Sequence, residues 1–170
     1  MRLIFIGDSL IEFFDWAARF PSHEVHNLGR AGETAEEMFD RLQRVVRAHP
    51  GADKVFIMSG INNISMEDYG IIGPYRESIT YLKYAYPKAT LYVHSLLPTL
   101  LPWIPAEEIV RMNGLLSDLA ARHGAQYIDV HSLFVERGAG RCLLDDGIHI
   151  SEEGYAIWSS AHDPIITPEI

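Results

Sequence analysis

Residues 4–11 read Ile4-Phe5-Ile6-Gly7-Asp8-Ser9-Leu10-Ile11, and the rest of the chain is organised around this stretch. The apolar run that ends at Ile6 predicts a short buried strand, and the residues after it form a turn signal. The apolar spacing beyond Ser9 then favours a helix. A serine at such a strand-to-helix turn exposes its hydroxyl beside free backbone N–H groups, which can stabilise an oxyanion. The alternative is that Asp8 or Ser9 merely caps the helix.

The composition is typical of a soluble globular protein, with 48% apolar and 22% charged residues in a chain of 170. We expect one domain over residues 1–170. The net charge of −9 and the lack of a basic stripe argue against a nucleic-acid partner. No apolar run is long enough for a membrane span, and we expect no signal peptide. A single cysteine, Cys142, fits a cytoplasmic location and is interpreted as a packing residue.

Strand-like apolar runs alternate with helical patterns along the whole chain. Further strands are predicted over 25–28, 54–58, 90–94 and 126–130, and helices over 35–49, 75–85, 106–122 and 151–158. Thr34 and Glu37 form a capping box at the start of one helix. Residues 134–144 are predicted to be irregular. This alternation predicts an α/β fold, a three-layer sandwich whose parallel sheet is covered on both faces.

Polar residues follow several of these strands directly. Ser9, Gly29 and Asn62 each come after a predicted strand, and parallel strands present their carboxyl ends at one edge of the sheet. His149 is a candidate general base, and Asp146 precedes it by three residues. Gly29 could offer a backbone N–H and Asn62 a side-chain amide. Together these residues supply the nucleophile, base, orienting carboxylate and oxyanion donors that acyl transfer requires.

Four short motifs in this order resemble the SGNH (GDSL) hydrolase superfamily. Residues 7–10, Gly-Asp-Ser-Leu, resemble its first block, and residues 27–34, Asn-Leu-Gly-Arg-Ala-Gly-Glu-Thr, its second. Residues 60–63, Gly-Ile-Asn-Asn, are similar to its third block, and residues 146–149, Asp-Gly-Ile-His, match its fifth. Each block alone is short, but the four fall in the expected order and span nearly the whole chain.

The resemblance implies a role for each matching position. Ser9 would be the nucleophile and would also donate its backbone N–H to the oxyanion hole, together with Gly29 and Asn62. His149 would activate Ser9, with Asp146 as its orienter. The resemblance also implies a five-stranded parallel, flavodoxin-like sheet and a hydrolase that needs no metal or cofactor. The superfamily includes esterases, thioesterases, lysophospholipases and carbohydrate acetylesterases.

One position departs from the family pattern, and several neighbours allow more than one interpretation. The usual Asp of the third block is Asn63 here, which puts the local hydrogen bonding of that loop in doubt. Asp145 could orient the base in place of Asp146, but the three-residue spacing selects Asp146. His94 is interpreted as structural. The substrate-binding candidates are Asp8, Leu10, Leu100 and Trp103.

The leading hypothesis is therefore a serine hydrolase that cleaves small carboxylic esters with short acyl chains. A thioesterase, lysophospholipase or acyltransferase could use the same residues, because water and other acceptors compete for one acyl-enzyme. The alternative from another class is a catalytically silent, flavodoxin-like binding module in which Ser9 is only a cap. The sequence leaves the oligomeric state open.

Overall fold

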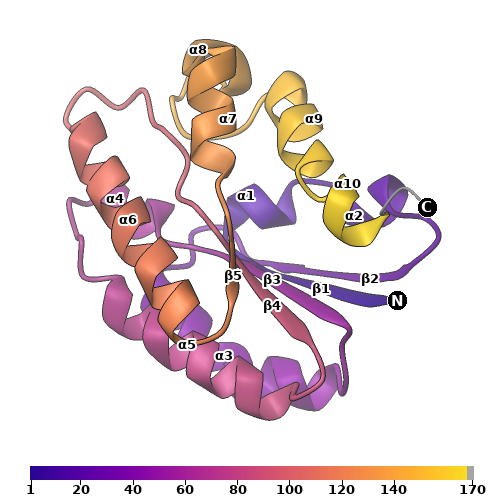
Figure 1. The fold of residues 1–170 in the computed structure, drawn as a ribbon. Helices are drawn as coiled ribbons and strands as arrows, with labels where there is room; N and C mark the ends of the chain where they lie inside the picture. The colour runs from indigo at the N-terminus through magenta and orange to yellow at the C-terminus, as the bar shows by residue number, and fades with distance from the viewer. Residues whose placement is uncertain (168–170) are drawn as a thin grey trace.

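The computed structural model describes residues 1–167 and contains a five-stranded parallel sheet in the order β2-β1-β3-β4-β5 (Figure 1). This order is the flavodoxin-like one, so the predicted fold class is confirmed. The strands are β1 (Arg2–Gly7), β2 (Glu24–Gly29), β3 (Lys54–Met58), β4 (Thr90–His94) and β5 (Gln126–Ile128).

Helices cover both faces of the sheet (Figure 1). One face carries α3 (Ala35–Ala48), α5 (Ile72–Ala85) and α6 (Ala106–Arg122). The opposite face carries α1 (Ser9–Glu12), α2 (Trp16–Arg19), α7 (Val130–Arg137), α8 (Ala139–Cys142), α9 (Glu152–Ser160) and α10 (Asp163–Ile166), while α4 (Ile61–Ser65) lies at the end of β3.

The central strands are buried on both faces, which explains their continuous apolar sequences. Along β1, Ile4 and Ile6 pack into the core under α3 and α5, whereas Leu3 and Phe5 pack into the core on the other face. Successive side chains of a strand point to opposite faces, so an all-apolar run is what a sheet covered on both sides requires. Cys142 is fully buried in the second core, in agreement with a packing role.

The register brings three strand ends to one level. Gly7 pairs with Gly29 of β2 on one side and with Met58 of β3 on the other. Ser9, the loop after β2 and the turn that contains Asn62 therefore leave the sheet at the same edge. The Thr34–Glu37 capping box forms as predicted at the start of α3.

Some local predictions of where helices and strands begin and end were wrong. The first predicted helix is two short ones, because the Asp15 carboxylate accepts a hydrogen bond from Ala18 N–H and starts α2. The last strand ends at Ile128 rather than Val130, because Asp129 caps α7. Residues 134–144, predicted to be irregular, belong largely to α7 and α8, and residues 61–65 form α4.

His94 pairs with a second histidine inside the core. Its Nε2 lies 2.8 Å from Nε2 of His162, and both residues are fully buried among aromatic side chains. Desolvation lowers the pKa of both imidazoles, that of His162 to about 4. Each Nδ1 faces a backbone carbonyl, so two neutral rings share two N–H protons among three close contacts. The buried pair is a structural element of the core.

Candidate active site

Ser9 lies at the start of α1, directly after the end of β1. Gly7 is required at this turn, because a Cβ there would lie 1.9 Å from the carbonyl oxygen of Met58. The Asp8 carboxylate caps α1 by accepting a hydrogen bond from Leu10 N–H at 3.0 Å. The cap is thus supplied by Asp8, which leaves the Ser9 hydroxyl available for other contacts.

Three side chains from two distant segments meet at this point. Ser9 Oγ lies 3.2 Å from His149 Nε2, and His149 Nδ1 lies 2.6 Å from Asp146 Oδ2. The Asp146 Oδ1 atom accepts hydrogen bonds from the backbone N–H groups of Ile148 and His149, both at 2.9 Å. These contacts fix the carboxylate relative to the imidazole and fix the tautomer with its proton on Nδ1, so that Nε2 can accept the Ser9 proton.

The pKa values of the two acidic residues near the serine are shifted in opposite directions. Partial desolvation opposes ionisation of Asp146, but the hydrogen bonds from Ile148 and His149 outweigh it and lower the pKa to about 2. Burial has the opposite effect on Asp8, which is 1% exposed, and raises its pKa to about 7. Asp146 is therefore a fixed anion beside the imidazole, as an orienting carboxylate must be.

The structure corrects the predicted role of Gly29. Its N–H donates to the side-chain oxygen of Asn27 at 3.0 Å, so it is not available to an oxyanion. A glycine is needed there for packing, because a Cβ would lie 2.2 Å from the backbone nitrogen of Glu12. Gly29 was predicted to be an oxyanion donor because it ends a strand. The same position places it directly against α1.

Gly32, three residues further on, has the backbone N–H that was expected at Gly29, unengaged within the described residues. The sequence analysis did not single out this residue. The loop is tied to α1 by a hydrogen bond from Ala31 N–H to the Glu12 carboxylate, and to Asn62 by a bond from Nδ2 to the Glu33 carbonyl at 2.8 Å. Gly32 lies between these two ties with φ of +79°, and its N–H makes no hydrogen bond within residues 1–167. The signal that the sequence offered was a glycine in the middle of the loop, because glycine is the residue that adopts a positive φ without strain.

Asn62 is the second residue of α4 and lies near the carboxyl end of β3, where it was expected. One N–H of its carboxamide is engaged by the Glu33 carbonyl, which leaves the second N–H for another acceptor. The backbone N–H of Ser9, at the first turn of α1, makes no hydrogen bond with any residue of the described part of the chain. Two donors, one N–H of the Asn62 carboxamide and the backbone N–H of Ser9, are therefore not engaged within residues 1–167.

Asn63 resolves the doubt raised by the missing aspartate. Its carboxamide oxygen accepts a hydrogen bond from Ala35 N–H, and its Nδ2 donates to the carboxylates of Glu36 and Asp68, all at 2.9 Å. An aspartate could not donate to two carboxylates, so the amide suits this pair of acids. The bond from Asn63 also lowers the pKa of Asp68. The substitution changes local hydrogen bonding and leaves Asn62 in place.

The candidate substrate-binding residues divide into two groups. Asp8 and Leu10 are each 1% exposed, one as a helix cap and the other in the core, which corrects their prediction as substrate contacts. Leu100 and Trp103 are about half exposed on the loop after β4. That loop is tied to the loop that contains Asp146 and His149, because Leu100 N–H donates to the Gly147 carbonyl at 2.9 Å.

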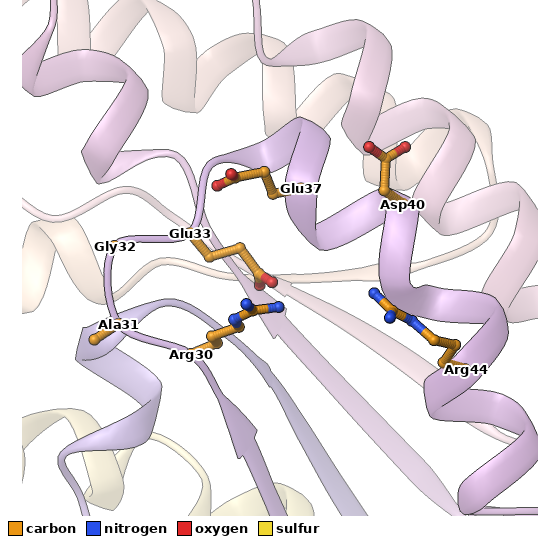
Figure 2. A pocket seen from close by; sticks show the side chains of 7 residues that line it. All are labelled: Arg30, Ala31, Gly32, Glu33, Glu37, Asp40 and Arg44. Carbon is orange, nitrogen blue, oxygen red and sulfur yellow. The ribbon is translucent and has the colours of Figure 1, made fainter.

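An aromatic ring and a cleft lie near this edge. The exposed Phe13 ring packs against the His149 ring, with 5.4 Å between centroids. A polar cleft of about 340 Å³ opens between the Gly32 loop and α3 (Figure 2). It is lined by Arg30, Ala31, Gly32, Glu33, Glu37, Asp40 and Arg44, and thus by none of Ser9, Asp146 and His149.

Comparison with known proteins identifies the family. The sequence model of the GDSL-like lipase/acylhydrolase family matches residues 5–157, and the chain belongs to this family. It is therefore related to acylhydrolases, in agreement with the resemblance seen in the motifs. No curated protein sequence matches the chain significantly.

Solved structures share the fold at low sequence identity. A protein from Streptococcus pneumonia superposes with a TM-score of 0.84 and 22% identity, covering 96% of this chain and 83% of that one. A lipase/acylhydrolase from Enterococcus faecalis gives 0.80 and 19%, with coverage of 99% and 98%. A variant of an acetyl xylan esterase from Geobacillus stearothermophilus also gives 0.80 and 19%, with coverage of 99% and 95%. These likenesses show the fold.

Proposed function

We propose that the protein is a serine esterase that forms an acyl-enzyme on Ser9. The observation that carries the proposal is the continuous contact from Ser9 Oγ through His149 to the Asp146 carboxylate. Family membership supports an acylhydrolase, and the contacts among Ser9, His149 and Asp146 support these three as its catalytic residues. Hydrolysis of p-nitrophenyl acetate, together with labelling by a fluorophosphonate, tests the proposal directly.

In the first step, His149 Nε2 accepts the proton of the Ser9 hydroxyl while Oγ attacks the ester carbonyl carbon. The tetrahedral intermediate collapses, and His149 returns the proton to the leaving alcohol. Water then repeats the sequence on the acyl-enzyme, which releases the acid and restores Ser9. Asp146 stabilises the imidazolium that forms in each half-reaction, and it stays ionised throughout.

The oxyanion would be held by the backbone N–H groups of Ser9 and Gly32 and by the second N–H of Asn62. Gly32 replaces Gly29 in this assignment, because the N–H of Gly29 is bonded to Asn27. Donors held in position before the reaction stabilise the developing charge without having to reorganise.

Replacing Asn62 with alanine should lower kcat on the order of 10²–10³-fold, as removal of one oxyanion donor does. KM should change little, because the oxyanion forms only near the transition state. Steady-state kinetics on p-nitrophenyl acetate measures both constants. A change confined to KM would show instead that Asn62 binds the ground-state substrate.

We also infer a preference for small acyl groups. The loop from Ser95 to Pro105 contains Pro98, Pro102 and Pro105, each with φ locked by its ring. It is tied to neighbouring segments by Leu100 N–H and by Trp103 Nε1, which donates to the Ser65 carbonyl at 3.2 Å. A stiff wall near the nucleophile leaves long chains without a pocket.

The expected result is a higher kcat/KM on acetyl to butyryl esters than on esters of about eight carbons or more. Each buried CH₂ adds about 0.8 kcal/mol of binding only where a pocket receives it. A series of p-nitrophenyl esters measures this preference, and Trp103→Ala should reduce it by opening the wall. A steady rise in kcat/KM with chain length would contradict the inference and favour a lysophospholipase or thioesterase.

Within residues 1–167, the helices are all too short or too polar to cross a bilayer. A small ester remains the proposed ligand, and the cytoplasmic location stays a prediction of the sequence.

A further inference from the structure

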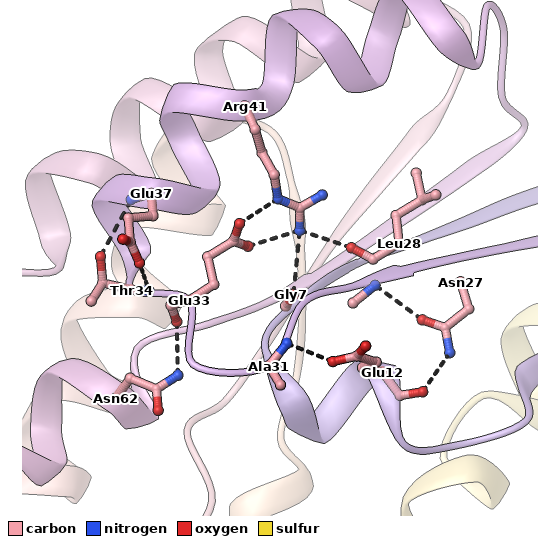
Figure 3. A network of polar contacts seen from close by, with 11 residues as sticks. Gly7, Glu12, Asn27, Leu28, Ala31, Glu33, Thr34, Glu37, Arg41 and Asn62 are labelled. Carbon is pink, nitrogen blue, oxygen red and sulfur yellow. Dashed lines mark hydrogen bonds and ion pairs between the residues drawn. The ribbon is translucent and has the colours of Figure 1, made fainter.

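Arg41 lies on α3 and reaches back to the carboxyl end of the sheet (Figure 3). Its guanidinium binds the Glu33 carboxylate through two atoms, Nε at 2.5 Å and Nη2 at 2.7 Å. The two side chains are only 11% and 2% exposed. A planar guanidinium that binds a carboxylate in this way fixes both the distance and the orientation of its partner.

The same guanidinium also binds the ends of two strands. Nη2 donates to the carbonyl oxygens of Leu28 at 2.8 Å and Gly7 at 3.3 Å. The first carbonyl belongs to β2 just before the Gly32 loop, and the second to β1 two residues before Ser9. Arg41 therefore touches both segments from which the proposed backbone donors of the oxyanion hole project.

Glu33 extends this network to the third donor. While its carboxylate is bound by Arg41, its backbone carbonyl accepts the hydrogen bond from Asn62 Nδ2 (Figure 3). A shift of Glu33 would therefore move the Asn62 carboxamide and the adjacent Gly32 peptide together. The other end of the loop is held independently, by the bond from Ala31 N–H to Glu12.

We propose that Arg41 is a positioning residue that sets the oxyanion hole, through Glu33, Leu28 and Gly7. The inference rests on the proposed esterase function, because it assigns Arg41 a role in stabilising the transition state of that reaction. Arg41 has no part in orienting His149, because the hydrogen bonds that hold the imidazole Nδ1 and the backbone N–H of His149 both go to Asp146.

Arg41→Met should lower kcat on p-nitrophenyl acetate on the order of 10²-fold, the cost of misplacing a catalytic group by about 1 Å. KM should change less than about threefold, because the ground-state carbonyl does not require the oxyanion donors. The midpoint of the pH profile of kcat/KM should stay where it is in the unmodified protein. Arg41→Lys should recover part of the loss, since one ammonium keeps the charge but not the two-atom contact.

The matched control is Arg47→Met, in the last turn of α3. Arg47 is exposed, forms no ion pair within residues 1–167 and lies outside the lining of the cleft beside the Gly32 loop, so this variant removes the same charge from the same helix without touching the loop. Its kcat should equal that of the unmodified protein. Equal losses in the two variants would overturn the inference, because net charge would then account for the effect.

A double variant separates positioning from stability. Arg41→Met alone leaves the Glu33 carboxylate buried without its partner, which lowers the melting temperature and could prevent folding. Glu33→Gln combined with Arg41→Met removes that isolated charge, so the melting temperature should recover, whereas kcat should stay low because the loop still lacks its bonds to the guanidinium. Recovery of kcat together with the melting temperature would overturn the inference.

The experiment also distinguishes this inference from the proposed function. If the unmodified protein neither hydrolyses esters nor reacts with a fluorophosphonate at Ser9, the proposed function fails. If the unmodified protein is active and Arg41→Met keeps its kcat, only the positioning role fails.

Discussion

Ser9→Ala should abolish ester hydrolysis and leave the fold unchanged. Loss of a nucleophilic serine removes the covalent route altogether, and in serine proteases such losses amount to a factor of about 10⁶ in kcat. The free energy of unfolding should change by no more than about 1 kcal/mol, because the hydroxyl contributes one hydrogen bond, to His149. The cap of α1 is untouched, since Asp8 supplies it.

Two measurements check this expectation. Kinetics on p-nitrophenyl acetate gives the residual rate, and mass spectrometry after fluorophosphonate treatment of the unmodified protein should place the adduct on Ser9. Ser59→Ala is the matched control, since Ser59 is a buried serine after β3 whose hydroxyl has no partner within residues 1–167. That control should keep full activity.

An adduct on a residue other than Ser9, or full activity in Ser9→Ala, would contradict the proposed mechanism. No labelling and no hydrolysis in the unmodified protein would favour the alternative of a silent binding module. If label appears on Ser9 but esters are hydrolysed poorly, an acyltransferase becomes the better description, because acylation would then be intact and water a poor acceptor.

The fold, and the proximity of the candidate catalytic residues to one another, could be predicted from the sequence because most of their signals are local. Apolar runs of strand length, the capping box at Thr34 and the helical spacing in α6 each reflect contacts within a few residues. The Asp146–His149 contact is equally local, since a turn of three residues brings the two side chains together. The contact between His149 and Ser9 is different, because the two residues are 140 positions apart and only the folded sheet brings them together.

The choice between the N–H groups of Gly29 and Gly32 could not be predicted because it depends on which of them a side chain engages in the folded loop. Gly29 and Gly32 look alike in sequence, and the choice between their N–H groups is made by Asn27, which occupies the first. The contacts of Arg41 could not be predicted either, because the sequence does not indicate that this helical arginine reaches the ends of two strands. Such contacts join residues that are 8 to 34 positions apart.

Asp146→Asn should cut kcat by roughly 10⁴-fold, the loss seen when the orienting aspartate of a serine protease triad is replaced in the same way. The reason is the direction of two hydrogen bonds. Oδ1 accepts from the N–H groups of Ile148 and His149, so an asparagine would keep its oxygen there and turn its NH₂ toward His149 Nδ1. The imidazole would then carry its proton on Nε2 and could not accept the proton of Ser9.

Asp145→Asn is the control for this substitution, because it removes the adjacent carboxylate and the same charge. The bonds to the imidazole and to the two N–H groups come from Asp146, so Asp145→Asn should keep kcat within about twofold, as surface substitutions away from a site usually do. Kinetics at saturating p-nitrophenyl acetate compares the two variants, and circular dichroism confirms that both are folded. If Asp145→Asn were the crippling change, the orienting carboxylate would be Asp145, and the contact at 2.6 Å between His149 and Asp146 would not be the one that operates during turnover.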